Sequence, residues 1–250
     1  MFFRIAAGIV CSTEKSSVFD RFRVPVAESS EPLVQLRITQ AEVGRAGLPL
    51  GMAGRLGTFS VDGDHLSCAC DWNFDSIRLV LQLCCALGAW RTGGVLLHGA
   101  GLIASDDASV LALAPSGGGK STLTDLVRLR SLSDECVIAH PGPPPTLAGT
   151  VIRSSARKTP SLETRPLRAL LLLEKSVRPF YEKLHSADGL RALAHQAFRF
   201  PSELGMKGSV LSRLAPVANS VPTYRFAFPK SAQADDLLSS LLNDLAKTNP

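Results

Sequence analysis

One segment near the middle of the chain, residues 111–123, limits the fold more than any other part of the sequence. The apolar run LALA leads into the turn PSGGG, which is followed by KST and then by a helical pattern. A strand, a glycine-rich turn and a helix in this order are typical of a phosphate-binding loop of the Walker A type. Three successive glycines let the backbone bend and leave no Cβ atom in the way of a phosphate group. The segment therefore predicts an α/β fold with a nucleotide-binding site.

The predicted loop and the helix after it supply the groups that hold a nucleotide. The first helical turn offers unpaired N–H groups and the positive end of the helix dipole to the phosphates. Lys120 is expected to reach the β- and γ-phosphates, and the hydroxyl of Ser121 to ligate Mg²⁺. The residues expected to bind the nucleotide are consecutive: Pro115, Ser116, Gly117, Gly118, Gly119, Lys120, Ser121 and Thr122.

The loop departs from the usual pattern at its first position, where Ala114 stands in place of a glycine. A glycine-rich turn can also join a strand to a helix without binding a ligand. The apolar run before the turn and the helical pattern after it favour the nucleotide site over this alternative.

Length and composition narrow the function classes. The 250 residues are enough for one large domain or two small ones. We expect an N-terminal α+β or mostly β segment over residues 1–75 and a nucleotide-binding domain over residues 76–250. The net charge of +5 suits an anionic ligand, but the basic residues are scattered and do not form the clustered face typical of nucleic-acid binding. Nucleic acid is therefore not an expected partner. No apolar run approaches the ~20 residues of a membrane span, so a membrane is not an expected partner either.

The cysteines and the first residues indicate where the protein works. Six cysteines are present without a Cys-x-x-Cys motif, which favours a reducing, cytoplasmic setting. His65, Cys68 and Cys70 are three potential metal ligands without a matching second cluster, and the alternative is two cysteines on the inward face of a strand. Residues 1–11 are mostly apolar and predict a first β-strand in preference to a short signal peptide.

Apolar periodicity predicts the remaining elements. Asp75 is a good N-cap for a helix that ends before the Gly93-Gly94 pair. The predicted elements are strands at 33–38, 131–138, 167–174 and 223–228, hairpins at 57–66 and 95–114, and helices at 75–91, 121–128, 188–199 and 232–246.

The hairpin at 95–114 carries a histidine in an otherwise apolar strand. If the turn centres near residues 106 and 107, His98 lies opposite Pro115, beside the mouth of the loop. An ionisable group in an apolar strand needs a polar partner. His98 is therefore either part of the site or a histidine that fills a gap in the sheet.

Two neighbouring acids follow the loop on the next predicted strand. Asp134 and Glu135 lie within 131–138, which should run parallel to the loop strand. Acids there can hold Mg²⁺, directly or through water, or accept the proton of a phosphoryl acceptor. The alternative is a strand end with two solvated acids.

The polar, basic stretch 150–168 covers the nucleotide or an acidic substrate, or else it is a solvated surface loop.

The order of these motifs resembles that of HPr kinase/phosphorylase and its shorter relatives, which include kinases encoded with peptide-modifying gene clusters. The chain has HG at 98–99, PSGGGKST at 115–122 and LSDE at 132–135. The family has a His-Gly pair, a Ser-Gly-x-Gly-Lys-Ser loop and an acidic pair in the same order. The strand PLRALLLLEK at 166–175 is also similar to one in the short relatives. The resemblance covers residues 93–175 well and the C-terminal part loosely.

The resemblance implies a fold like the nucleotide domain of phosphoenolpyruvate carboxykinase, a mixed sheet flanked by helices, with ATP and Mg²⁺ as cofactors. It also implies phosphoryl transfer to a serine hydroxyl of a protein or peptide. By this resemblance Lys120 clamps the phosphates and Asp134 acts as the base. Ser121, Asp134 and Glu135 hold or assist the metal, and His98 lies near the reacting phosphate. The chain departs from the family in having Glu135 where true HPr kinases have a second aspartate.

Two functions stay open from the sequence. The first is an ATP- and Mg²⁺-dependent serine kinase. The second is a catalytically weak or inactive nucleotide-binding regulatory partner, whose bound ATP orders a loop such as 141–168. A conventional P-loop ATPase or GTPase fits less well, because a hairpin strand precedes the loop and no Asn-Lys-x-Asp motif is present. The sequence also leaves open the identity of the acceptor and whether the chain forms a homo-oligomer.

Overall fold

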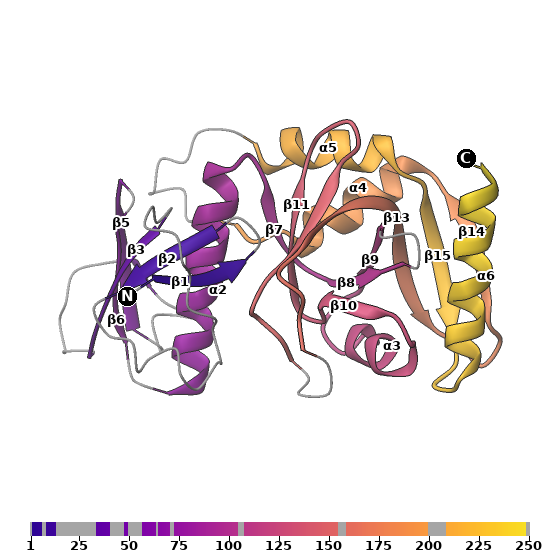
Figure 1. The fold of residues 1–250 in the computed structure, drawn as a ribbon, viewed down its shortest axis with the longest axis horizontal. Coiled ribbons are helices and arrows are strands. Elements are labelled where there is room, and N and C mark those ends of the chain that lie inside the picture. Colours follow the sequence, from indigo (N-terminus) through magenta and orange to yellow (C-terminus); the bar gives the residue numbers. More distant parts are fainter. Residues whose placement is uncertain are drawn as a thin grey trace. The chain divides into compact units, whose positions relative to one another are not determined.

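The chain consists of two compact units, each built on a mixed sheet. A computed structural model describes residues 2–6, 9–13, 34–40, 48–49, 57–63, 65–70, 73–104, 108–154, 159–199 and 209–248. One unit comprises residues 1–92 and 199–207, and the other comprises residues 93–198 and 208–250. Helices pack against the sheet in both units, so the fold belongs to the α/β class (Figure 1). Among the described residues, no helix is both long and apolar enough to cross a membrane.

The first unit holds a six-stranded sheet in the order β1-β2-β3-β6-β5-β4. Residues 1–11, predicted as a single first strand, instead contain β1 and the start of β2, which pair antiparallel. The predicted strand at 33–38 is present as β3, and the hairpin at 57–66 is present as β5 and β6, with Asp62 opposite His65. Only β2–β3 and β3–β6 are parallel pairs among those described. The strands are β1 (Phe2–Ala6), β2 (Ile9–Thr13), β3 (Val34–Gln40), β4 (Leu48–Pro49), β5 (Gly57–Asp62) and β6 (His65–Cys70).

The helix α2 (Phe74–Arg91) belongs to this first unit, because it packs on β1, β2, β3 and β6. The boundary between the units therefore falls after Thr92, and the expected boundary after residue 75 is wrong. The N-cap is also two residues earlier than expected. Asn73, not Asp75, accepts a hydrogen bond from the backbone N–H of Ser76 at 2.9 Å. Asp75 lies in the first turn, where its charge favours the helix dipole.

The second unit contains a larger mixed sheet. Its strand order is β10-β8-β9-β13-β12-β11-β7, with β15 beside β13 and β14 beside β15. β13 runs parallel to both β9 and β15, and the other described pairs are antiparallel. The strands are β7 (Val95–His98), β8 (Ala100–Ile103), β9 (Ser109–Leu113), β10 (Arg130–Ser133), β11 (Cys136–His140), β12 (Thr146–Gly149), β13 (Thr164–Lys175), β14 (Phe180–Leu184) and β15 (Thr223–Phe228).

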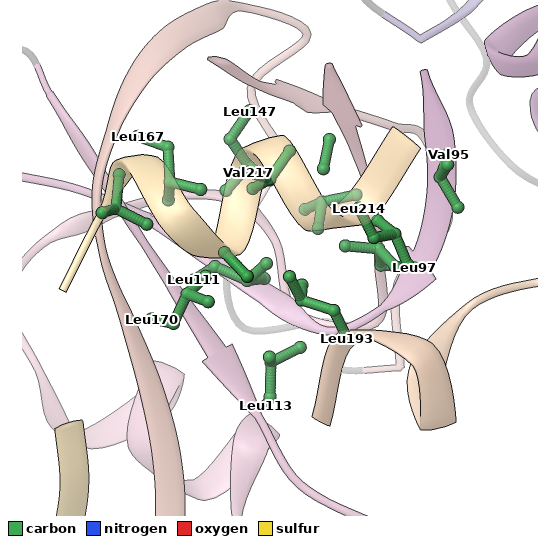
Figure 2. Close-up of a cluster of buried hydrophobic side chains, with 14 of the residues drawn as sticks. Val95, Leu97, Leu111, Leu113, Leu147, Leu167, Leu170, Leu193, Leu214 and Val217 are labelled. Atoms are coloured by element: carbon green, nitrogen blue, oxygen red, sulfur yellow. The ribbon is translucent and has the colours of Figure 1, made fainter. Parts of the chain in front are cut away.

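Helices cover both faces of this sheet. Leu170 of β13 packs with leucines of α4 (Ser186–Gln196) and α5 (Val210–Ser220), a cluster that Figure 2 shows. The neighbouring Leu171 points to the other face, where it packs with residues of α3 (Lys120–Leu126) and α6 (Gln233–Thr248). Because both faces are covered, β9 is buried at every position. The predicted strands at 167–174 and 223–228 and the predicted helices at 121–128, 188–199 and 232–246 are confirmed, whereas α5 was not predicted.

In the second unit, two predicted strands are each broken in two. The run 95–104 divides at Gly99 into β7 and β8, and the run 131–138 divides at residues 134 and 135 into β10 and β11. β7 pairs with β11, while β8 pairs with β9 and β10. β10 and β9 are both antiparallel to the strand between them, β8, so the expected parallel direction of β10 and the loop strand is confirmed. Each break moves the chain from one set of strand partners to another.

A small charged cluster ties residues 159–165 to the sheet. The carboxylate of Glu163 accepts hydrogen bonds from Ser161 and Arg165, and Arg130 lies 3.2 Å away. These groups, the Ser161 hydrogen bond first, lower the pKa of Glu163 from 4.5 to about 2. At pH values above 4.5, the ionised carboxylate of Glu163 therefore stabilises the folded unit. This contribution is lost as the pH falls from 4.5 toward 2.

We expect Glu163→Gln to lower stability at pH 7 by about 0.5 kcal/mol, since exposed ion pairs contribute little. The side chain keeps 34% of its surface exposed, which limits the effect. The difference in unfolding free energy between variant and wild type should shrink as the pH falls from 6 to 3. Urea unfolding, monitored through hydrogen exchange of the β13 amides, measures this difference. A difference that does not change over this range contradicts the assignment.

Candidate active site

The glycine loop, residues 114–119, joins β9 to α3 and depends on its glycines. Gly117 and Gly119 have φ angles of 74° and 104°, which favour glycine. The backbone N–H of Gly118 donates to the carbonyl oxygen of Pro115 at 2.9 Å. A Cβ atom on Gly118 would lie 2.6 Å from the Cβ atom of Ala114. The tight turn therefore requires glycine at position 118.

Lys120, the first residue of α3, turns its side chain into this loop. Its ammonium group donates to the carbonyl oxygens of Ala114 at 2.7 Å and Pro115 at 3.2 Å. Only 6% of the residue is exposed. Burial lowers the pKa of the Lys120 ammonium, while the nearby Cys136 and Glu135 act in the opposite direction. A buried cation at the base of a glycine loop is suited to bind an anion.

The acid turn, residues 133–136, lies between β10 and β11. Asp134 and Glu135 are 5% and 6% exposed, so the alternative of two solvated acids is wrong. The hydroxyl of Ser133 accepts hydrogen bonds from the backbone N–H groups of Glu135 and Cys136, both at 3.2 Å. It donates in turn to the carbonyl oxygen of Ile152. These bonds fix the turn that presents the two acids.

Ser154 connects the acid turn to the start of α3. Its backbone N–H donates to Oδ1 of Asp134 at 3.0 Å, and its hydroxyl donates to Oδ2 at 2.6 Å. The same hydroxyl oxygen lies 2.7 Å from Oγ of Ser121, in the first turn of α3. A hydrogen-bonded chain therefore runs from Ser121 through Ser154 to Asp134.

Residues 150–154, the strap, follow the acid turn along its length. The hydroxyl of Thr150 donates to the carbonyl oxygen of Cys136 at 2.7 Å and accepts from the backbone N–H of Ile152 at 3.2 Å. This part of the basic stretch 150–168 is thus attached to the site and is not a loop that only contacts solvent. Of that stretch, Arg157 and Lys158 lie outside the described residues.

Sequence reasoning missed Ser154. Asp134 and Ser154 are 20 positions apart, and Ser121 and Ser154 are 33 positions apart. No spacing within the sequence marks such a residue. The only signal was the expectation that the stretch 150–168 covers a bound ligand.

His98 does not lie opposite Pro115, and that expectation is wrong. The hairpin of β8 and β9 is present, but its ladder begins at Ala100, which pairs with Ala112. His98 ends β7 and pairs with Cys136 on β11. The backbone N–H of Gly99 donates to the carbonyl oxygen of Glu135 at 3.0 Å. The backbone of His98 is therefore next to the acid turn instead of the loop mouth.

The remaining predicted site residues lie at the loop and the start of α3. Pro115 and Ser116 are exposed, and Ser121 and Thr122 are half-buried. The structure therefore brings together the loop, the lysine, the helix hydroxyl and the acidic pair. By contrast, His65 is exposed, Cys68 and Cys70 are buried, and in the described part of the chain no three His, Cys, Asp or Glu side chains gather as a metal-binding group.

The chain was also compared with known protein families and with curated proteins. No family model matches the chain, and no curated protein matches it either. The case for a function therefore depends on the residues of the site and their geometry.

Proposed function

We propose that this protein binds ATP with Mg²⁺ at the glycine loop and transfers the γ-phosphoryl group to a serine hydroxyl of a protein or peptide. The observation that carries the proposal is the hydrogen-bonded chain from Ser121 through Ser154 to Asp134. It joins α3, which follows the glycine loop, to the acid turn, the two halves of the proposed site that lie apart in the sequence. The resemblance to HPr kinase-like proteins supports the same reading, including a P-loop domain like that of phosphoenolpyruvate carboxykinase.

The residues present fit the groups that this reaction needs. A Cβ atom at Gly118 would fill the turn, and Lys120 supplies a buried positive charge at its base. Ser121, Asp134 and Glu135 would hold Mg²⁺, since this ion prefers oxygen ligands and carboxylates. When bound, Mg²⁺ supplies neutralisation of the phosphate charge.

Asp134 would take the proton of the acceptor hydroxyl. Its Oδ2 already accepts a hydrogen bond from a serine hydroxyl at 2.6 Å, which is the contact that a general base makes with its substrate. Lys120 would balance the charge that develops on the transferred group. Most of the rate acceleration would then come from positioning and electrostatics.

The proposal also includes the cellular location, the class of acceptor and the places of two further residues. We place it in the cytoplasm, on the support of cysteines that occur without a Cys-x-x-Cys motif. The acceptor would be a protein or peptide, and the scattered basic residues favour it over nucleic acid. Glu135 would assist the metal, and His98 would lie near the acid turn.

Lys120→Met is expected to weaken ATP binding about 10- to 100-fold, because one charge-assisted interaction with phosphate is lost. Titration calorimetry with ATP and Mg²⁺ measures this loss. Lys183→Met is the matched control, since Lys183 is an exposed lysine of β14, and it should bind as wild type does.

The alternative function predicts a different pattern. Tight ATP binding by the wild type, with neither hydrolysis nor transfer to a serine peptide, would favour a regulatory nucleotide-binding protein. A wild-type protein that does not bind ATP at all would overturn the assignment of the glycine loop.

A further inference from the structure

Ser154 presents its hydroxyl to the acid turn as an external acceptor would. The hydroxyl donates to Oδ2 of Asp134 at 2.6 Å and lies 2.7 Å from Oγ of Ser121. Asp134 is 5% exposed, whereas Ser154 itself is exposed. A reachable serine hydroxyl thus contacts both the carboxylate and the helix hydroxyl of the proposed site.

We propose that Ser154 is a self-phosphorylation site, an inference that rests on the proposed function. The protein transfers the γ-phosphoryl group of ATP to its own Ser154. The strap would then carry a phosphoryl acceptor that is part of the protein itself.

The step balances without any further reagent. The Oγ atom of Ser154 forms a bond with the γ-phosphorus of ATP, and the bond from that phosphorus to the β,γ-bridging oxygen breaks. The hydroxyl proton passes to Oδ2 of Asp134, which already accepts its hydrogen bond. ADP leaves, and phosphoserine remains at position 154.

Other serines near the site are placed differently. Ser133 is 1% exposed, and its hydroxyl donates to the backbone carbonyl of Ile152. Ser161 also donates to a carboxylate, but that carboxylate belongs to Glu163, in the cluster with Arg130 and Arg165. Among the serines that the structure describes, Ser154 is the one whose hydroxyl contacts both Asp134 and α3.

The test is incubation of the full chain with γ-labelled ATP and Mg²⁺, without any added acceptor. The phosphate incorporated is counted, and its position is found by mass spectrometry of peptides. We expect close to one phosphoryl group per chain at position 154, at a rate per chain that does not depend on protein concentration. Ser154→Ala and Asp134→Asn should each incorporate about 100-fold less.

Two further variants separate the chemistry from the fold. Ser161→Ala is the matched control, because it removes another serine hydroxyl bonded to a carboxylate, and it should incorporate phosphate as wild type does. Ser154→Thr keeps a hydroxyl at the same position and should retain labelling, now on threonine.

ATP binding measured in parallel distinguishes this inference from the proposed function. A protein that binds ATP, and either hydrolyses it or phosphorylates a serine peptide, but carries no phosphate at position 154 overturns the inference and leaves the function standing. Labelling that persists in Ser154→Ala, or binding without any labelling, also overturns it. A protein that does not bind ATP overturns both.

Discussion

Asp134→Asn is expected to slow phosphoryl transfer to a serine acceptor by about 10²- to 10⁴-fold, while ATP binding persists. The amide has the size of the carboxylate but accepts a proton poorly. It keeps an oxygen that can accept one of the two hydrogen bonds from Ser154. Transfer is measured as the initial rate of ADP production in the presence of a serine peptide, and binding is measured by calorimetry.

The matched control for Asp134→Asn is Asp188→Asn. Asp188 lies in the first turn of α4, where it pairs with Arg191, and it belongs to the same unit. This variant should turn over as wild type does. Unchanged turnover in Asp134→Asn would remove the aspartate from the mechanism. Loss of ATP binding in that variant would indicate that Asp134 holds the metal–nucleotide complex more than it moves a proton.

The elements of the second unit could be predicted because their signal is local. β13 carries four consecutive leucines, residues 170–173, and lies between two parallel neighbours with helices on both faces. A strand buried on both sides must be apolar at nearly every position, and that run is visible in the sequence. The same argument explains why β9 and the glycine loop could be predicted from residues 111–123 alone.

The strand breaks could not be predicted, because they depend on partners far away in the chain. Gly99 separates two runs that are both apolar, and nothing in its neighbourhood shows that β7 pairs with β11 while β8 pairs with β9. A Cβ atom at Gly99 would lie 2.8 Å from the side chain of Leu111, so the glycine permits close packing at this point. For this reason, the predicted place of His98 opposite Pro115 is wrong.

The candidate site could be predicted only in part, for the same physical reason. The spacing of Lys120 and Asp134 indicated two halves of one site, since both follow strands of one sheet. The contact that joins them comes from Ser154, which lies beyond the next hairpin. Hydrogen bonds across 20 and 33 positions leave no periodic trace in the sequence.

Gly149→Ala is expected to destabilise the second unit by on the order of 3 kcal/mol. Gly149 ends β12, and a Cβ atom there would lie 1.8 Å from the carbonyl oxygen of Ser161 and 2.8 Å from that of Leu132. The backbone must therefore separate, which weakens the hydrogen bonds from Gly149 to Glu163 and from Ser161 to Ser131. Amide exchange of β12 and β13 measures the effect, and protection should fall about 100-fold.

The matched control for Gly149→Ala is Gly142→Ala, in the connection between β11 and β12. There the nearest atom to a new Cβ is the carbonyl oxygen of Pro144 at 3.3 Å, so a small shift is enough. This variant should stay within about 0.5 kcal/mol of wild type. Gly149 immediately precedes the strap, so Gly149→Ala should also shift Ser154 and weaken its hydrogen bond to Asp134. This variant should therefore reduce phosphoryl transfer. Wild-type protection of β12 in Gly149→Ala would contradict the close approach of residues 149 and 161, and with it the anchoring of the strap.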